Sequence, residues 1–483
     1  MEDRTLEKRA IVSAVWKFME RIIAQLVSMV VSIILARLLS PKDYSSVSLV
    51  AVFFSFANIL ISGGFNSALI QKKNSDKLDY STILIFSIVV SLVAYTVLFF
   101  TSPFIARVYH RDELCQIIRV MGLSLPITAI KSVWCAYISS RLMFKKFFLA
   151  TLGGTLVSAF VGIFMAYNGF GAWALVVQNM TNTTIDTIIL VITTHVYFGF
   201  SFSFQRFKRL FRYSWKVLVS SIIGTIYSQI VPLVIGVKYT NEDLSYYTKG
   251  RSFPELISST TTYTLSAVLF PFLSKFQESK NKLLEYTRLY IRISSYITFP
   301  LMLGFFSVAD VFVNVVLTEK WMFAVHYIKV FCVANMFEMV HVGICETIKA
   351  MGRSDVFLKM EIVKKTCYFI IIALFLLFTN SPEILAYAFI ACSLIALIVN
   401  TYPIRKMLDY KLSFQIMDII PNLISSITMA VVVSCIGLLL PNNRISTLFV
   451  QVLVGGIIYI GLSVISNNPN LKYVIRIVKN RKS

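Results

Sequence analysis

The stretch WKFMERIIAQLVSMVVSIILARLLSPKDY, from Trp16 to Tyr44, decides the fold. Residues 22–39 are almost wholly apolar, and a helix of that length rises far enough to cross a bilayer. Polar residues nevertheless recur at steps of three and four, which places them on one helical face: Lys17, Arg21, Gln25, Ser28 and Ser32. A helix lining a wet cavity inside a bundle has such a stripe. Close packing against another helix is the alternative interpretation of the serines.

Composition identifies a polytopic membrane protein. Of the 483 residues, 57% are hydrophobic and 14% are charged, whereas soluble domains carry about 25% charged residues. The net charge of +22 comes from short basic clusters between apolar runs, a pattern that membrane topology explains without a nucleic-acid partner. The seven cysteines and four histidines are scattered. Since metal-ligand, phosphate-loop and hydrolase motifs are missing from the sequence, we expect no metal, no cofactor and no enzymatic activity.

The pattern predicts an all-α protein with fourteen transmembrane helices. The expected spans are 14–38, 45–67, 80–104, 115–138, 148–167, 171–196, 213–236, 252–274, 289–312, 323–348, 360–379, 382–401, 417–440 and 445–466. Of the Lys and Arg residues counted in the connections, 28 fall on one side of the membrane and 9 on the other. The positive-inside rule therefore predicts that both termini are cytoplasmic.

The chain also repeats itself at an offset of about 200 residues. Trp16-Lys17 recurs as Trp215-Lys216, and Ser40-Pro41-Lys42-Asp43 recurs as Thr240-Asn241-Glu242-Asp243. The second pair predicts a capping box at the start of the following helix. Because six spans separate the copies, the repeats have the same orientation, as in parallel-repeat transporters. We expect an N-lobe over 1–204, a C-lobe over 205–415 related to it by a pseudo-two-fold axis along the membrane normal, and two further helices within 416–483.

Polar faces similar to that of the first span occur in spans 2, 7 and 8. Spans 1 and 2 are the first two of the N-lobe, and spans 7 and 8 are their equivalents in the C-lobe. This correspondence favours a central hydrophilic cleft over packing alone. The predicted cavity residues are Arg21, Gln25, Ser28, Asn58, Ser62, Thr225, Arg251, Glu255 and Thr262.

Charged side chains inside the spans need a reason, since each costs about 2.5–3.5 kcal/mol at a helix centre. Carboxylates and a histidine in a partly dry cavity can carry coupling protons, and the candidates are Glu338, His341, Glu20 and Asp186, the last without a partner in its own span. Local ion pairs are the alternative: Glu20 beside Lys17, Arg251 with Glu255, and Glu361 with Lys365. For Lys349, Lys364 and Lys365 we expect snorkelling to the interface.

Five further segments carry a family resemblance: LARLLSPKDY from Leu35, SGGFNSALIQKK from Ser62, YYTKGRSFPELI from Tyr246, LFPFLSK from Leu269 and GRSDVFLKMEIVKK from Gly352. With these segments the chain resembles bacterial polysaccharide exporters over essentially its whole length. These are the Wzx-type lipid-linked oligosaccharide flippases of the multidrug/oligosaccharidyl-lipid/polysaccharide superfamily. The resemblance implies a fold like that of the lipid II flippases, with two six-helix lobes around a V-shaped cavity and two extra C-terminal helices.

The resemblance also implies a function. The expected activity is the flipping of a polyprenyl-pyrophosphate-linked oligosaccharide across the bacterial cytoplasmic membrane, for O-antigen, capsule or exopolysaccharide synthesis. The expected partner proteins are a polysaccharide polymerase and assembly proteins. Contact with the pyrophosphate is carried over to Arg21 and Arg251, because guanidinium groups bind phosphate in bidentate fashion. Two alternatives stay open: an ion-coupled multidrug antiporter of the same superfamily, and a membrane glycan polymerase or ligase. The outer connections of about 5–15 residues disfavour the enzyme.

Overall fold

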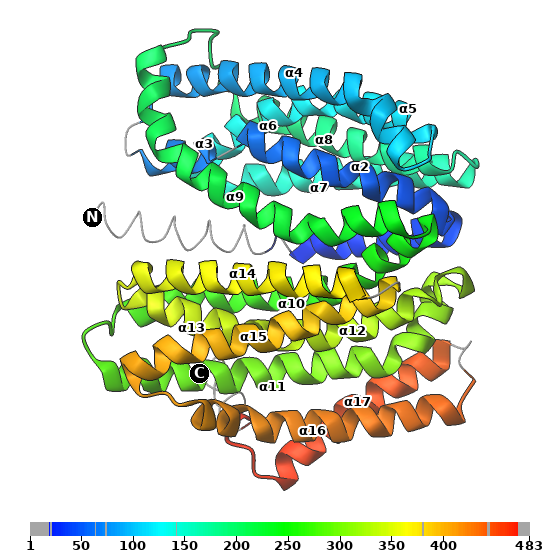
Figure 1. The fold of residues 1–483 in the computed structure, drawn as a ribbon, viewed down its shortest axis with the longest axis vertical. Helices are drawn as coiled ribbons and strands as arrows, with labels where there is room; N and C mark the ends of the chain where they lie inside the picture. Colours follow the sequence, from blue (N-terminus) through cyan, green and yellow to red (C-terminus); the bar gives the residue numbers. More distant parts are fainter. Residues whose placement is uncertain are drawn as a thin grey trace. The chain divides into compact units, whose positions relative to one another are not determined.

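The computed structural model describes residue 19 and residues 22–62, 64–72, 75–141, 143–378, 381–441 and 445–471. These residues form helices joined by short connections, with no strand among them (Figure 1). The chain divides into two compact units, Met1–Ser245 and Tyr246–Ser483. We describe each unit by itself. The all-helical fold class predicted above is confirmed.

Unit 1 packs its helices around an aromatic core. Phe65, Tyr80, Trp134 and Phe198 form this core, with ring centroids 4.8–5.0 Å apart for Trp134–Phe198 and Tyr80–Phe198. The helices of the unit are Ile22–Leu38, α2 (Pro41–Ser62), α3 (Phe65–Gln71), α4 (Lys77–Val108), α5 (Glu113–Gly122), α6 (Ser124–Ser140), α7 (Phe144–Tyr167), α8 (Ala172–Thr194) and α9 (Phe204–Lys238). Extensive contact joins α7 to α8, and α9 packs on α2, α3 and α4.

Gly64 explains part of the SGGF segment. Its φ of 81° lies in the left-handed region, between α2 and α3. A Cβ at this position would lie 2.8 Å from both the carbonyl oxygen of Ser214 and the Cβ of Val217. Only glycine meets both demands, the backbone conformation and the close approach of α9.

Unit 2 is organised around α11 (Lys280–Phe312), which packs on α12, α13 and α16. The other elements are α10 (Asn241–Ser274), which begins at the end of unit 1, a π-helical turn (Val313–Leu317), a 3-10 turn (Glu319–Trp321), α12 (Ala324–Met336), α13 (Glu338–Ala350), α14 (Ser354–Phe378), α15 (Pro382–Leu408), α16 (Leu412–Leu439) and α17 (Ile445–Ile465). At Gly250 a Cβ would lie 2.5 Å from the Cβ of Tyr327, so glycine in the KGRSF segment permits the close crossing of α10 and α12.

An ion-pair clamp attaches the C-terminal helices to unit 2. The buried carboxylate of Asp418 on α16 accepts hydrogen bonds from Arg288 Nε at 2.8 Å and Arg292 Nε at 2.7 Å, both on α11. Tyr410 donates its hydroxyl to the same group at 2.8 Å. Hydrogen bonds from two arginines and a tyrosine satisfy a carboxylate that would otherwise be costly to bury.

The described part of each of the fourteen predicted spans lies in a helix or a helix pair. Eleven helices in the described residues are long and apolar enough to cross a membrane. The three other predicted spans correspond to Ile22–Leu38, α10 and α14, so the total of fourteen stays a prediction. Exposed side chains such as Phe160 on α7, at 74%, and Ile457 on α17, at 69%, suit hydrocarbon surroundings.

Local structure repeats in the two halves of the chain, in agreement with the predicted capping boxes. Asp43 N donates to Ser40 Oγ and Ser40 N to Asp43 Oδ2, at 3.3 and 2.9 Å. Likewise, Asp243 N donates to Thr240 Oγ1 at 3.3 Å and Thr240 N donates to Asp243 Oδ2 at 3.0 Å. The predicted spans 4 and 10 are also both broken, between α5 and α6 at Leu123 and between α12 and α13 at Phe337. The division at residues 204 and 415 into lobes stays a prediction.

Candidate functional site

A small polar cavity in unit 1 receives the stripe of the first span. Ser28 and Ser32 line a cavity of about 150 Å³ together with Thr155 and Ser158 on α7 and with Gln178 and Asn182 on α8. Asn182 donates its amide to Ser158 Oγ at 3.2 Å. A cavity of this size and polarity holds a few water molecules. The two serines therefore face polar groups of α7 and α8 within their own unit, and the central cleft stays a prediction.

The other predicted cavity residues of unit 1 lie on packed helices. Asn58 and Ser62 on α2 are half-buried, and Ser62 Oγ donates to the Asn58 carbonyl at 2.7 Å. Thr225 lies half-buried on α9, which packs against α2. Gln25 is half-buried on the first helix. Arg21 and Glu20 lie outside the described residues, as does Lys17.

Asp186 has a partner that the sequence reasoning missed. Its carboxylate Oδ2 lies 2.5 Å from Nζ of Lys131 on α6, and its side chain is 6% exposed. A Cβ at Gly154 on α7 would lie 2.9 Å from the Cβ of Asp186, which shows how closely α7 and α8 approach there. The signal available in the sequence was Lys131 itself, a basic residue inside the apolar run 115–138. Asp186 is thus a charge-balanced residue of the unit 1 interior.

In unit 2, α10 presents the predicted Arg251–Glu255 pair. Arg251 Nε lies 2.5 Å from Glu255 Oε1, one helical turn away. The guanidinium of Arg251 also lies over the rings of Phe331 on α12 and Phe389 on α15, 5.9 and 5.5 Å from their centroids. Such contacts hold a guanidinium in place without neutralising it. Further along α10, Thr262 Oγ1 lies 3.0 Å from Met339 Sδ, next to Glu338 on α13.

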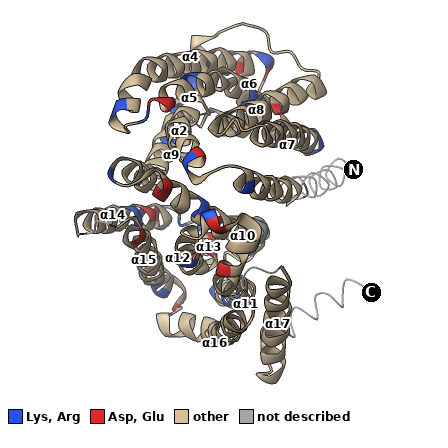
Figure 2. Cartoon of the chain, turned by 90° about the vertical axis from the view of Figure 1, so that its right-hand side faces the viewer, with Lys and Arg blue, Asp and Glu red and all other residues tan. Residues whose placement is uncertain are grey.

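A charged cluster joins α10, α13 and α14. Glu338, exposed on α13, interacts electrostatically with Lys364, Glu361 and Glu255. Lys364 and Glu361, one turn apart on α14, form a direct ion pair. We define the charged cluster as Arg251, Glu255, Glu338, His341, Glu361 and Lys364. Figure 2 shows basic and acidic segments close to α10, α12 and α13.

The structure corrects two expectations about α14. Lys364 was expected to snorkel to the interface, but its side chain is only 9% exposed and is ion-paired. Glu361 was expected to pair with Lys365, and it pairs with Lys364 instead. The reason is helical geometry, since positions i+3 and i+4 are both within reach and burial on the α13 side favours the former. Lys364 is therefore the residue of this region that sequence reasoning misjudged.

His341 completes the cluster from the protein interior. It is buried on α13, and its Nδ1 lies 3.3 Å from Nδ2 of Asn400 on α15. With His341 neutral, the cluster contains two cations and three carboxylates, a formal charge of −1. One additional proton or monovalent cation would balance it. The described residues contain no group of three or more His, Cys, Asp or Glu side chains placed to hold a metal ion.

Fold and charge placement together define the class of protein, a multi-pass α-helical membrane protein with polar and charged groups inside both units. The chain belongs to the family described as polysaccharide biosynthesis protein, whose profile matches residues 34–326. This match confirms the resemblance stated for the sequence.

Several relatives of the chain have names that refer to surface polysaccharides or to the cps region. An uncharacterized membrane protein in the cps region of Klebsiella pneumoniae is 24% identical over 97% of both chains. The lipopolysaccharide biosynthesis protein WzxC of Escherichia coli strain K12 is 20% identical over 74% of each chain. The succinoglycan biosynthesis transport protein ExoT of Rhizobium meliloti is 22% identical over 60% of this chain and 59% of its own.

Solved structures have the same fold. The lipid II flippase MurJ in an inward closed conformation superposes with a TM-score of 0.77, at 14% identity, over 94% of this chain and 98% of MurJ. An inward-facing multidrug resistance MATE family transporter of the MOP superfamily gives a TM-score of 0.62, at 14% identity, over 82% of this chain and 98% of its own. At this level of identity the two likenesses concern the fold.

Proposed function

We propose that the protein flips a polyprenyl-pyrophosphate-linked oligosaccharide across the bacterial cytoplasmic membrane during surface polysaccharide synthesis. The observation that carries the proposal is the family match over residues 34–326, because it covers more than half of the chain and includes three of the four spans with polar faces, spans 2, 7 and 8. The MurJ-like fold and the relatives from polysaccharide export support the same conclusion. Both termini are proposed to be cytoplasmic, as the distribution of basic residues predicts.

The physical problem is a polar sugar chain that cannot cross about 30 Å of hydrocarbon unaided. Polar side chains on the first two spans of each lobe, such as Ser28, Asn58, Thr225 and Thr262, would supply hydrogen bonds to the sugar, while the polyprenyl chain stays in lipid. Lobes 1–204 and 205–415, with residues 416–483 attached to the second, would rock to give alternating access. The glycosidic and pyrophosphate bonds remain intact, so the protein is a transporter rather than an enzyme.

Arg251 is our proposed pyrophosphate ligand in unit 2, together with Arg21 from the first span. Contacts with Phe331, Phe389 and Glu255 fix the orientation of the Arg251 side chain, and its side chain is 20% exposed. A positioned guanidinium can form bidentate bonds with phosphate oxygens.

Glu338 and His341 are our proposed coupling residues. The excess carboxylate of the charged cluster attracts a cation or proton, and Lys364 lies near enough to change the affinity of Glu338 for it. Since Lys131 already balances Asp186, we infer a structural ion pair there. Glu20 retains its proposed role as a coupling candidate. A polysaccharide polymerase and other assembly proteins are proposed partners, as recipients of the flipped substrate.

The test is complementation of a strain that lacks the gene. Cells without the protein should lose surface glycan and accumulate an intact lipid-linked oligosaccharide that is accessible only from the cytoplasm. The wild-type chain should restore the surface glycan and remove the accumulated oligosaccharide. Arg251→Ala and Arg21→Ala should do neither at matched protein level. Unchanged surface glycan in the deleted strain would contradict the proposal, and a chemically altered oligosaccharide would indicate an enzyme.

A cation–drug antiporter is the second candidate, because the charged cluster has an excess of carboxylate and the fold is shared with MATE transporters. It predicts resistance to cationic dyes upon expression. Dye resistance with unchanged glycan would favour the antiporter over the flippase.

A further inference from the structure

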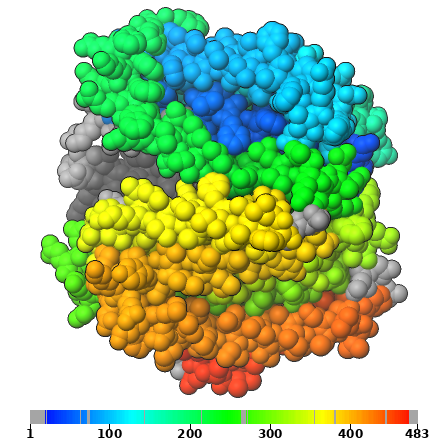
Figure 3. Space-filling model, viewed as in Figure 1, coloured from blue at the N-terminus to red at the C-terminus, as the bar shows by residue number. Residues whose placement is uncertain are grey.

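A groove between α14 and α15 is unconnected with the polar faces described above. It has a volume of about 930 Å³ and lies at the end of unit 2 where the α13–α14 connection, the end of α15 and the start of α11 meet. In the space-filling view α14 and α15 lie side by side across the front of this unit (Figure 3). The positive-inside count assigns this end to the cytoplasmic side.

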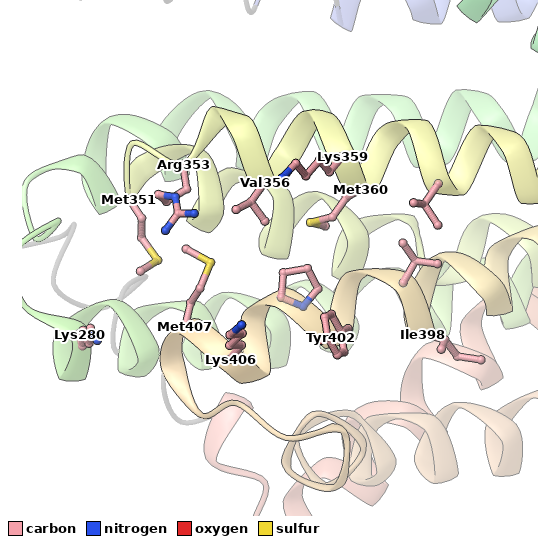
Figure 4. Close-up of a pocket in the computed structure, with 13 residues that line it drawn as sticks. Lys280, Met351, Arg353, Val356, Lys359, Met360, Ile398, Tyr402, Lys406 and Met407 are labelled. Atoms are coloured by element: carbon pink, nitrogen blue, oxygen red, sulfur yellow. The ribbon is translucent and has the colours of Figure 1, made fainter.

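The walls of the groove are apolar. They consist of Met351, Val356, Met360, Val363 and Ile398, of which Val363 and Ile398 are 49% and 64% exposed. Figure 4 shows Met351 and Met407 pointing toward each other across the groove. Exposed apolar walls on a membrane helix contact hydrocarbon chains. They offer few hydrogen bonds, so the groove does not suit a sugar chain.

Four cations line the groove: Lys280 from α11, Arg353 and Lys359 from the α14 side, and Lys406 from α15 (Figure 4). Arg353 is bound to Asp355 by two hydrogen bonds of 3.0 Å. This guanidinium lowers the pKa of Asp355 to about 2, so the two charges cancel at physiological pH. Among the described residues Lys280, Lys359 and Lys406 form no ion pair. Three positive charges therefore remain uncompensated.

Tyr402 indicates the level of the groove in the membrane. It is 74% exposed and lies one turn before Lys406 on α15. Exposed tyrosines and lysines of membrane helices concentrate at the level of the lipid head groups. The lysines are thus placed at head-group depth, and the apolar walls extend from there toward the hydrocarbon.

We propose that this groove binds an anionic glycerophospholipid of the cytoplasmic leaflet, with its phosphate among Lys280, Lys359 and Lys406 and an acyl chain between α14 and α15. Basic pockets between membrane helices on the cytoplasmic side bind phosphate-bearing lipid head groups in this way. We name a phospholipid as the ligand because it is the abundant phosphate-bearing lipid next to the groove. Mass action favours it over a scarce polyprenyl carrier. This proposal does not depend on the flippase function.

The test measures lipid adducts on the purified full chain by native mass spectrometry, with phosphatidylglycerol and phosphatidylcholine in equal amounts. The wild-type chain should retain phosphatidylglycerol selectively. In K359Q/K406Q its affinity should fall roughly thirtyfold, since each basic residue near an anionic surface contributes about fivefold. Ile398→Trp, which fills the groove and keeps every charge, should reduce binding as well. The matched control is K208Q/R209Q, which removes two exposed basic residues of α9 in unit 1, and it should bind like the wild type.

Three outcomes would overturn the proposal. The first is equal loss of phosphatidylglycerol in K359Q/K406Q and in the control, which would indicate a diffuse charge effect. The second is displacement of the lipid by soluble glycerol phosphate, which would show that the apolar walls contribute nothing. The third is preferential capture of polyprenyl phosphate over phosphatidylglycerol, which would make the groove a site for the substrate lipid. Flipping is not part of the readout, so a failed flippase assay leaves this test unaffected.

Discussion

Unit 1 buries Asp186 against a single counter-charge, Lys131, whereas unit 2 gathers three carboxylates and two cations on α10, α13 and α14. In the first case the ion pair is complete, and the neighbouring cavity is lined by serine, threonine and amide groups. In the second case the charges do not cancel. A balanced pair tolerates burial and stays ionised, while an unbalanced cluster can take up a proton or cation. The comparison supports our proposal that unit 1 supplies hydrogen bonds and that ion coupling takes place in unit 2.

The largest effect is expected at Lys364. Lys364→Met leaves Glu361 without its partner, and removal of one member of a buried pair destabilises by ~3–5 kcal/mol. The double variant K364M/E361L removes both charges and should regain most of that stability, as thermal melting in detergent would show. Its flipping rate should remain at least tenfold below the wild type, because Glu338 then lies beside two apolar side chains in place of two charged ones. Wild-type transport by a stable double variant would reduce the unit 2 cluster to a structural role.

The corresponding change in unit 1 should have a different outcome. Lys131→Met leaves the carboxylate of Asp186, which is only 6% exposed, without its counter-charge and should also cost ~3–5 kcal/mol. K131M/D186L should restore both stability and transport, because no third charged side chain among the described residues forms an ion pair with either partner. A double variant that melts like the wild type and yet fails to flip substrate would make Asp186 a coupling residue and end the distinction between the units.

A smaller effect concerns the packing that supports each region. Gly250→Ala should destabilise unit 2 by ~1–3 kcal/mol, because the new Cβ would lie 2.5 Å from the Cβ of Tyr327. Gly224→Ala on α9 of unit 1 is the matched control. The space around it is open to 4 Å, and alanine in a helix is favoured over glycine by ~0.5–1 kcal/mol. Equal melting temperatures of the two variants would show that the α10–α12 crossing does not limit stability.

The sequence predicted the helices well because an apolar run of about twenty residues is a local signal. It did not predict the breaks at Leu123 and Phe337, since hydrophobicity continues across both. Of the site, it predicted the one-turn pair Arg251–Glu255, but for Glu361 it named Lys365 in place of Lys364. The partners of Asp186 and Asp418 lie on other helices. Periodicity and spacing within one span do not show which helices pack against each other.

The most direct test of the account is whether the polar faces of both units meet water along the transport route. In a chain whose seven native cysteines have been replaced, single cysteines at Ser62, Thr225, Glu255 and Thr262 would be treated with a membrane-impermeant, charged methanethiosulfonate reagent. The account predicts that all four positions react and that lipid-linked oligosaccharide slows each reaction. Reaction only with a lipid-soluble maleimide, at positions in either unit, would contradict it.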